Sequence, residues 1–120
     1  MNYVYHRNKP YYGDTTAIIT EDASAYVMIT QFDGNKDTAV IHDLVVLKDR
    51  RGEGIGSLIL EEAVAEAGRL GAGYARLAVE PNSWLEEWYK RHGFMKVDAI
   101  KDREHIFNVL ERPLINMVTL

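Results

Sequence analysis

The sequence predicts a mixed α/β (α+β) domain, with a central sheet that begins in an antiparallel hairpin and two main helices in the second half. Two segments rich in β-branched and aromatic residues, 15–22 and 24–32, follow each other closely. A nearly apolar segment, 38–47, then leads through a glycine-rich loop into an amphipathic helix. Strand and helix alternate after it, which indicates crossover connections and parallel strands in the middle of the sheet. A chain of 120 residues accommodates one domain, which we place at residues 1–120.

The N-terminal half contains the predicted strands of the hairpin region. We expect a short strand at residues 3–5, and an antiparallel hairpin formed by 15–22 and 24–32. The residues DGNKD (33–37) indicate a turn. The segment 38–47 predicts a third strand, and its nearly continuous apolar character favours burial on both faces.

The second half alternates helices and strands. We expect a helix over about 55–70, with Glu62, Glu66 and Arg69 on its wet side, and a buried strand at 74–79. A short helix follows within 81–93, because Ser83 and Glu86 have the spacing of a capping box. Two final strands, at 94–100 and 104–112, complete the pattern, and we expect the apolar tail 114–120 to pack on the body or on a partner.

Composition excludes several classes of protein. The formal charge of −4 argues against a general nucleic-acid binder. The chain has no cysteine, which excludes disulfides, thiolate metal sites and a cysteine nucleophile. The four histidines show no metal-ligand spacing, so we expect no metal. The N-terminus does not read as a signal peptide and no apolar run approaches the length of a membrane span, so we expect a cytoplasmic protein that binds no membrane.

The glycine-rich loop is typical of phosphate binding. Gly52, Gly54 and Gly56 lie between a strand and a helix, where backbone N–H groups and the helix dipole favour an anion. A P-loop is excluded, because no lysine follows the last glycine. The dinucleotide fingerprint G-x-G-x-x-G is disfavoured, because Ser57 stands three positions after Gly54. The pattern R-x-x-G-x-G fits Arg51, Gly54 and Gly56, although a glycine-rich turn without a ligand stays an alternative.

From Ile41 to Val97 the sequence resembles the GNAT superfamily of acyl-CoA N-acyltransferases. The segment IHDLVVLKDRRGEGIGSLIL resembles that family's fourth strand, pyrophosphate loop and following helix. The segment EPNSWLEEWYKRHGF resembles its fifth-strand exit and last helix. The resemblance implies a V-shaped opening between strands 38–47 and 74–79, into which the pantetheine arm of acetyl-CoA inserts.

The resemblance also implies which residues bind acetyl-CoA. The backbone of one segment contacts pantetheine and the acetyl group, a loop holds the pyrophosphate, and the start of the last helix contacts the arm further along. By the resemblance, the residues at pantetheine and the acetyl group are Leu44, Val45 and Val46. Those at the pyrophosphate are Arg51, Gly52, Glu53, Gly54, Ile55, Gly56 and Ser57. Those further along the arm are Asn82 and Ser83.

Two residues are candidates for proton transfer. Tyr89 matches the family's general acid for the departing thiolate and also lies against the cofactor. His42 occupies the position of a glutamate base in related enzymes, and histidine as a residue type suits the role of a base near neutral pH. Alternation predicts that Val40, His42, Leu44 and Val46 share one face, with Asp43 pointing the other way as a brace. The alternatives are an aromatic packed at a helix end and a histidine lining a pocket.

The resemblance therefore implies an acetyl-CoA-dependent N-acetyltransferase that acts directly on a primary amine, in a small molecule or a protein. A non-catalytic acyl-CoA-binding module and a plain interaction domain are the alternatives. Only some 14 residues precede the hairpin, too few for the strand and two helices that usually stand there in the family. We therefore expect an acceptor side that is open, completed by a homodimer, or built by the apolar tail 114–120.

Overall fold

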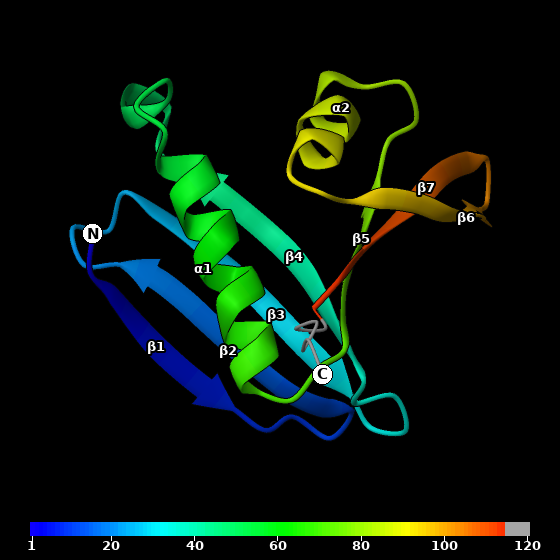
Figure 1. Ribbon diagram of the computed structural model, residues 1–120, viewed down its shortest axis with the longest axis horizontal. Coiled ribbons are helices and arrows are strands. Elements are labelled where there is room, and N and C mark those ends of the chain that lie inside the picture. The colour runs from blue at the N-terminus through cyan, green and yellow to red at the C-terminus, as the bar shows by residue number, and fades with distance from the viewer. Residues whose placement is uncertain (115–120) are drawn as a thin grey trace, which may run out of the picture.

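The computed structural model describes residues 1–114, so the tail beyond Leu114, and its expected packing on the body or a partner, lies outside the described residues. One seven-stranded sheet has the order β1-β2-β3-β4-β5-β7-β6 (Figure 1). Its strands and helices are β1 (Tyr3–Asn8), β2 (Gly13–Thr20), β3 (Ala25–Phe32), β4 (Thr38–Val46), α1 (Ile55–Arg69), β5 (Tyr74–Val79), α2 (Trp84–Arg91), β6 (Met95–Asp102) and β7 (His105–Pro113), with a short 3₁₀ turn η1 (Lys48–Arg50) after β4.

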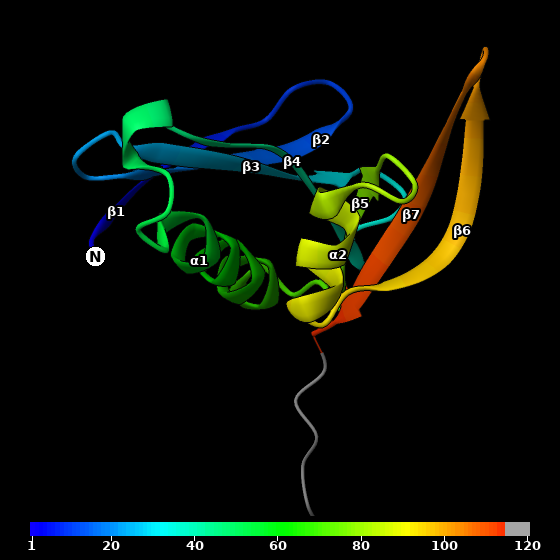
Figure 2. The same cartoon turned by 90° about the horizontal axis from the view of Figure 1, so that it is seen from above.

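The predicted fold class is confirmed. The strands β1 to β4 form an antiparallel meander, and β4 pairs with β5 in parallel. The last strand, β7, lies between β5 and β6 and is antiparallel to both. Both helices lie on the same side of the sheet, as Figure 2 shows with the sheet almost edge on. The opposite face of the sheet is therefore left without a helix from residues 1–114.

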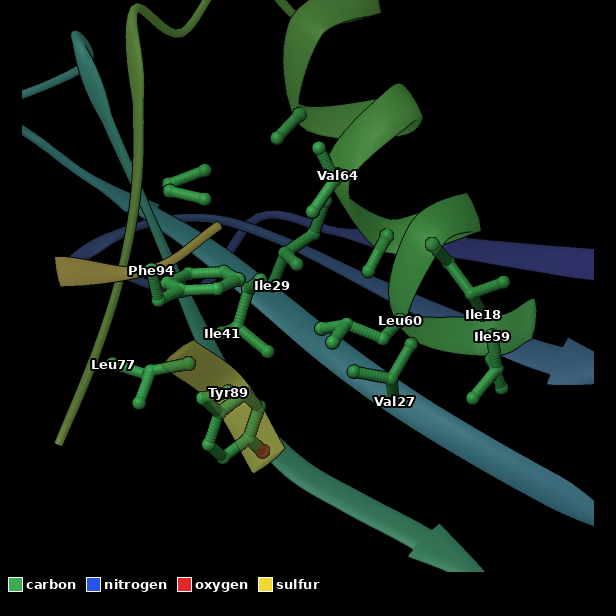
Figure 3. Close-up of a cluster of buried hydrophobic side chains, with 14 of the residues drawn as sticks. Ile18, Val27, Ile29, Ile41, Ile59, Leu60, Val64, Leu77, Tyr89 and Phe94 are labelled. Atoms are coloured by element: carbon green, nitrogen blue, oxygen red, sulfur yellow. The ribbon is translucent and has the colours of Figure 1, made fainter. Parts of the chain in front are cut away.

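The core lies between α1 and the middle of the sheet. Ile18, Val27 and Ile29 project from β2 and β3 and are almost completely buried against Ile59 and Leu60 of α1 (Figure 3). The second helix adds Tyr89 to the same cluster, and Phe94 follows it. Burial of apolar side chains such as these contributes about 1.5–3 kcal/mol each. This packing fixes both helices relative to the strands on which they rest.

One residue expected on the wet side of the first helix is buried. The side chain of Glu66 is only 3% exposed and pairs with Arg7 of β1, at 2.6 Å, and with Arg69. Burial opposes ionisation of this carboxyl, but hydrogen bonds from Arg69 and Arg7 outweigh it and hold its pKa below the ordinary value. The edge strand β1, expected only as a short segment, is thus tied to α1 by charge.

The strand β4 is not buried on both faces along its whole length. Its first residues are buried, but Asp43 and Val45 are exposed. The expected alternation is wrong beyond His42, because Asp43 adopts a left-handed φ of 55° and the register against β3 shifts. His42 pairs with Met28, whereas Val45 pairs with Tyr26 and Val46 with Ala25. Val46 therefore faces the helices instead of sharing the face of His42.

Truncation of Phe94 tests the core. Its side chain is 1% exposed and packs on Tyr89 with ring centroids 5.7 Å apart. We expect Phe94→Ala to lower the free energy of unfolding by about 3–5 kcal/mol, through lost burial and the cavity it leaves. Urea denaturation measures the change. Trp84→Ala is the control, because Trp84 is 76% exposed. It should change stability by only about 0.5 kcal/mol.

Candidate functional site

The parallel pair β4–β5 opens after a few residues. Only Thr38–Val40 pair with Tyr74–Arg76, although both strands continue beyond this point. The strand β5 stays paired with β7 as far as Val79, and β4 stays paired with β3 as far as Val46. The two strands diverge visibly in Figure 1. The backbone groups of β4 that face the gap thus lie where an inserted chain of amides could pair with them.

The glycine-rich loop crosses the end of this split. Gly52 and Gly54 have φ values of 83° and 80°, which a side chain would strain, and Gly54 is the N-cap of α1. Within residues 1–114, no side chain caps this helix. Since the first N–H groups of a helix have no partner within it, those of α1 are presented to the loop. A Cβ added at Gly56 would lie 3.6 Å from the ring of Trp88, which is an ordinary contact distance.

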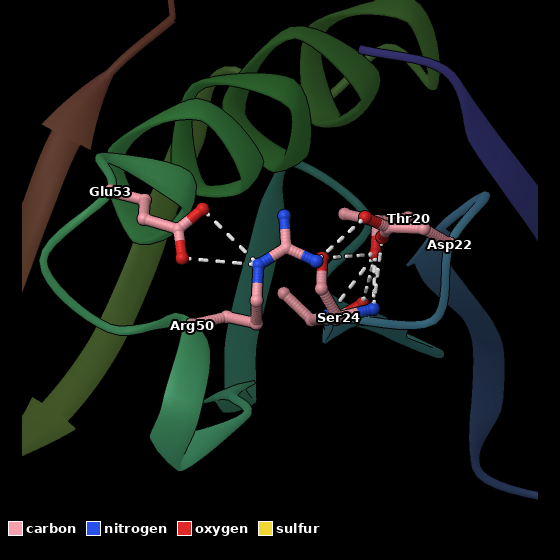
Figure 4. A network of polar contacts seen from close by, with 6 residues as sticks. Thr20, Asp22, Ser24, Arg50 and Glu53 are labelled. Carbon is pink, nitrogen blue, oxygen red and sulfur yellow. Dashed lines mark hydrogen bonds and ion pairs between the residues drawn. The ribbon is translucent and has the colours of Figure 1, made fainter.

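The loop is fastened to the β2–β3 turn by a polar network (Figure 4). The Nε of Arg50 donates to both carboxylate oxygens of Glu53 at 3.1 Å, and its Nη1 donates to Asp22 at 3.2 Å. Hydrogen bonds from Ser24, with further ones from Thr20 and Arg50, hold the pKa of the Asp22 carboxyl well below its ordinary value. Arg50 is thereby committed to the protein, whereas Arg51 makes one bond, to the Val46 carbonyl at 3.3 Å.

A cavity of about 520 Å³ joins the split to the loop. Most of the residues predicted to bind the cofactor line it, from the end of β4, the loop and the first turn of α1. They are Leu44, Val45, Val46, Arg51, Gly52, Gly54, Ile55, Gly56 and Ser57. The cavity wall is apolar along β4 and α2 and rich in backbone N–H groups at the loop. Such a wall suits a ligand with an apolar arm and an anionic end.

Four predicted cofactor residues do not line this cavity. Glu53 belongs to the loop but pairs with Arg50. Asn82, Ser83 and Tyr89 lie at the end of β5 and on α2, further along the split. Trp84, Leu85 and Trp88 of α2 also line the cavity, although no sequence motif pointed to them. Their spacing on one side of a short amphipathic helix was the available signal.

The start of α2 is held by a buried carboxylate. The Ser83 Oγ accepts from the backbone N–H of Glu86 at 3.2 Å, as the capping box predicts. The Oε1 of Glu86 accepts from the N–H of Asn82 at 3.0 Å, and its Oε2 accepts from the side-chain amide of Asn108 at 2.6 Å. The bonds from Asn108 and Asn82 hold the pKa of Glu86 below its ordinary value. Glu86 thus links the exit of β5 to β7 and fixes Asn82, whose φ is 58°.

Tyr89 is buried on the helix side of the sheet. It is 7% exposed and makes edge contacts with Trp88 and Phe94. Its hydroxyl points away from the Phe94 side of the cluster (Figure 3). Burial raises the pKa of this hydroxyl above its ordinary value of 10.0, so the group is protonated at neutral pH. A protonated phenol in an apolar site can donate a proton or a hydrogen bond.

His42 lies on the face without helices. Its Nε2 is 2.8 Å from the Oγ1 of Thr30, and its Nδ1 is 3.1 Å from the Oδ2 of Asp43. Asp43 therefore does not point away from His42, as alternation predicted, because the left-handed backbone at Asp43 turns its carboxylate back toward the ring. His42 and Tyr89 belong to opposite faces of the sheet on either side of the split.

A larger hollow, of about 660 Å³, lies away from the split near the C-terminal end of α1. Its cationic side chains are already paired: Lys9 and Lys36 with Asp14, and Arg7 with Glu66. It contains none of the predicted site residues. Among residues 1–114, no cluster of three or more histidine, aspartate or glutamate side chains is arranged to hold a metal ion. No helix of the described chain is long and apolar enough to cross a membrane.

A split parallel pair, an uncapped helix start and an apolar cavity between them form a site for a ligand with an apolar arm and an anionic end. The family model of the acetyltransferase (GNAT) domain matches residues 11–96. The chain therefore belongs to the GNAT family, and its fold supports acyl transfer from acyl-CoA.

Solved structures share this fold. Nourseothricin acetyltransferase superposes with a TM-score of 0.69 at 16% identity, over 96% of this chain and 86% of that one. The ribosomal-protein-S18-alanine N-acetyltransferase from Escherichia coli superposes with a TM-score of 0.69 at 15% identity, over 87% of this chain and 70% of that one. The yncA protein from Salmonella typhimurium was solved with its cofactor acetyl-CoA. It superposes with a TM-score of 0.69 at 18% identity, over 88% of this chain and 68% of that one. No curated protein matches the sequence.

Removal of the Glu86 charge tests how α2 is held. Because the pKa of Glu86 is depressed below 4.5, its stabilising contribution is full above pH 4.5 and is lost as pH falls through the folded-state pKa. We expect Glu86→Gln to lower the melting temperature at pH 7, since glutamine has one carbonyl oxygen and a donating NH2 group in place of two accepting oxygens. The difference from the parent should shrink below pH 4.5. Glu87→Gln, 63% exposed on the same turn, is the control and should show no such difference.

Proposed function

We propose that this protein transfers an acetyl group from acetyl-CoA directly to a primary amine. The observation that carries the proposal is the β4–β5 split, which opens onto the cavity formed by Leu44–Val46, the glycine loop and α2. In the proposed complex the pantetheine amides pair with the free backbone groups of β4. The pyrophosphate lies on the N–H groups of the loop and of the first turn of α1, and Arg51 adds charge. Glu53, Asn82 and Ser83 complete the predicted cofactor contacts.

Tyr89 is the proposed general acid. The amine attacks the acetyl carbon, the C–S bond breaks, and the sulfur leaves as a thiolate that must take a proton. A thiol has an ordinary pKa near 8.5 and a phenol near 10, so proton transfer from phenol to thiolate is slightly uphill. The Tyr89 hydroxyl must therefore lie close to the departing sulfur. Burial keeps the hydroxyl of Tyr89 protonated at neutral pH, which a general acid requires.

His42 is the proposed base. A carboxylate only accepts hydrogen bonds, so the contact with Asp43 favours a hydrogen on Nδ1 and leaves the lone pair on Nε2. The hydroxyl of Thr30 donates to that lone pair in the resting state. After Nε2 gains the proton of the amine, the bond reverses, and the Thr30 hydroxyl can turn to Thr15, 3.1 Å away. The hydroxyls of Thr30 and Thr15 can therefore satisfy both the neutral and the protonated imidazole of His42.

The acceptor is proposed only as a primary amine. Nourseothricin acetyltransferase and the S18-alanine N-acetyltransferase resemble this chain equally, and their names point to a small molecule and to a protein. The uncovered sheet face supports an open acceptor side or a homodimer that covers it, and the dimer stays a proposal. Cytoplasmic location, with no binding to nucleic acid or membrane, is also proposed, from the charge of −4 and the lack of cysteine.

Coenzyme A binding tests the cavity. At a concentration 100 times its Kd, coenzyme A should stabilise the protein by about 2.7 kcal/mol, read as a rise in melting temperature. Gly54→Ala should lower the intrinsic stability by about 1–2 kcal/mol through strain at φ 80° and also abolish most of the ligand effect. Gly34→Ala is the matched control: its φ is 85°, and an added Cβ meets nothing within 4 Å at either glycine. Equal loss of the ligand effect in both variants would refute the assigned loop.

Loss of one hydroxyl tests the general acid. We expect Tyr89→Phe to lower kcat for acetyl transfer by about 10²-fold, with little change in the Kd of coenzyme A, because the ring still packs on Phe94. Release of free thiol from acetyl-CoA, followed with a panel of amines, measures the rate. Tyr11→Phe is the control, since Tyr11 is 96% exposed. Undiminished turnover in Tyr89→Phe would show that another group protonates the sulfur.

A further inference from the structure

The face of the sheet opposite the helices contains a chain of hydrogen-bonded polar side chains at the mouth of the split. It runs from Thr15 through Thr30 and His42 to Asp43, with successive distances of 3.1, 2.8 and 3.1 Å. Thr30 is 2% exposed and Thr15 is 8% exposed, so one end of the chain is anchored in the sheet. The other end is the Asp43 carboxylate, which is 62% exposed.

The backbone at Asp43 is the unusual element of this chain. Its φ of 55° is left-handed, a conformation that a non-glycine residue adopts at an energetic cost. The bulge turns the carboxylate onto the ring of His42 just beyond the last β4–β5 pair, Val40–Arg76. The strain thus coincides with the place where the strands part.

The carboxylate keeps accepting capacity that the protein does not use. It receives one hydrogen bond, from the Nδ1 of His42, and among residues 1–114 no lysine or arginine pairs with it. Arg76, which belongs to the last β4–β5 pair, is already paired with Glu111, with Nε 2.6 Å from the carboxylate. The helices α1 and α2 occupy the other face, so the described residues leave the side of His42 and Asp43 without a helix.

We propose that Asp43 binds the acceptor as an alkylammonium ion and that His42 and Thr30 hold the carboxylate in place for it. This inference rests on the proposed function and adds to it the charge state in which the acceptor arrives. Primary alkylamines are cations at neutral pH, with pKa values near 10.4, and an exposed carboxylate without a cationic partner attracts them. The proton must be lost after docking and before the amine attacks.

Steady-state kinetics with Asp43→Asn and Asp43→Gly test the proposal. The probes are n-propylamine, a linear diamine and a tripeptide with a free N-terminus. Both variants should raise the KM of each accepted amine about tenfold and leave the KM of acetyl-CoA unchanged. The parent KM should also rise with ionic strength, and that of Asp43→Asn should not. Asp33→Asn is the control, because Asp33 is similarly exposed in the turn before β4.

Asp43→Gly separates recognition from folding. Glycine adopts φ 55° without strain, so this variant should melt at or above the parent temperature while it loses amine recognition. An unchanged amine KM in both variants would overturn the proposal, and so would a KM for acetyl-CoA that rises equally.

A binding measurement separates this proposal from the proposed function. If the parent acetylates no amine in the panel, the proposed transfer fails, but docking can still be observed. Titration of n-propylamine into ¹⁵N-histidine-labelled protein at low salt should shift the ring signals of His42 in the parent and not in Asp43→Asn. n-Propanol, which has no charge, should shift neither. Equal shifts in the parent and in Asp43→Asn, or none in the parent, would refute Asp43 as the ammonium site.

Discussion

The early parting of β4 and β5 is the constraint on which the other features of the site depend. A parallel pair that stops after three residues leaves polar backbone groups facing a gap, and unpaired groups are costly unless water or a ligand satisfies them. The gap persists because each strand is held on its outer side, β4 by β3 and β5 by β7. The position of β7 between β5 and β6 is therefore a requirement of the split, since β5 would otherwise have no partner at its end.

Two local devices prepare the gap for a ligand with an anionic end. The loop after β4 is bent by two left-handed glycines and fastened to the β2–β3 turn through Arg50, so its amides are fixed before any ligand arrives. At the other side, Glu86 fixes the exit of β5 and the start of α2. Preorganised donors lose little conformational entropy on binding, which raises affinity without additional contacts.

Patterns confined to a few neighbouring residues could be predicted from the sequence, and those that depend on distant partners could not. The hairpin, the position of the glycine loop between a strand and a helix, and the Ser83 cap are of the first kind, and the structure confirms them. The burial of Glu66 depends on Arg7, which lies 59 residues away in the chain. The bulge at Asp43 has no signature in composition, because a left-handed aspartate looks like any other polar residue in an alternating strand. One unpredicted residue there reverses every later orientation in β4.

The bulge also explains why the two faces of the split can serve different substrates. Before Asp43, the face away from the helices carries Val40 and His42; after it, Val46 turns toward α1 and the cavity. A regular strand would have placed His42 and Val46 on the same face, so that acceptor and cofactor would compete for one side of the sheet. With the change of register, β4 presents apolar side chains on the helix side and a carboxylate–imidazole pair on the other. In the proposed reaction the amine and the departing sulfur then lie on opposite sides of the acetyl carbon, each beside the residue that exchanges a proton with it.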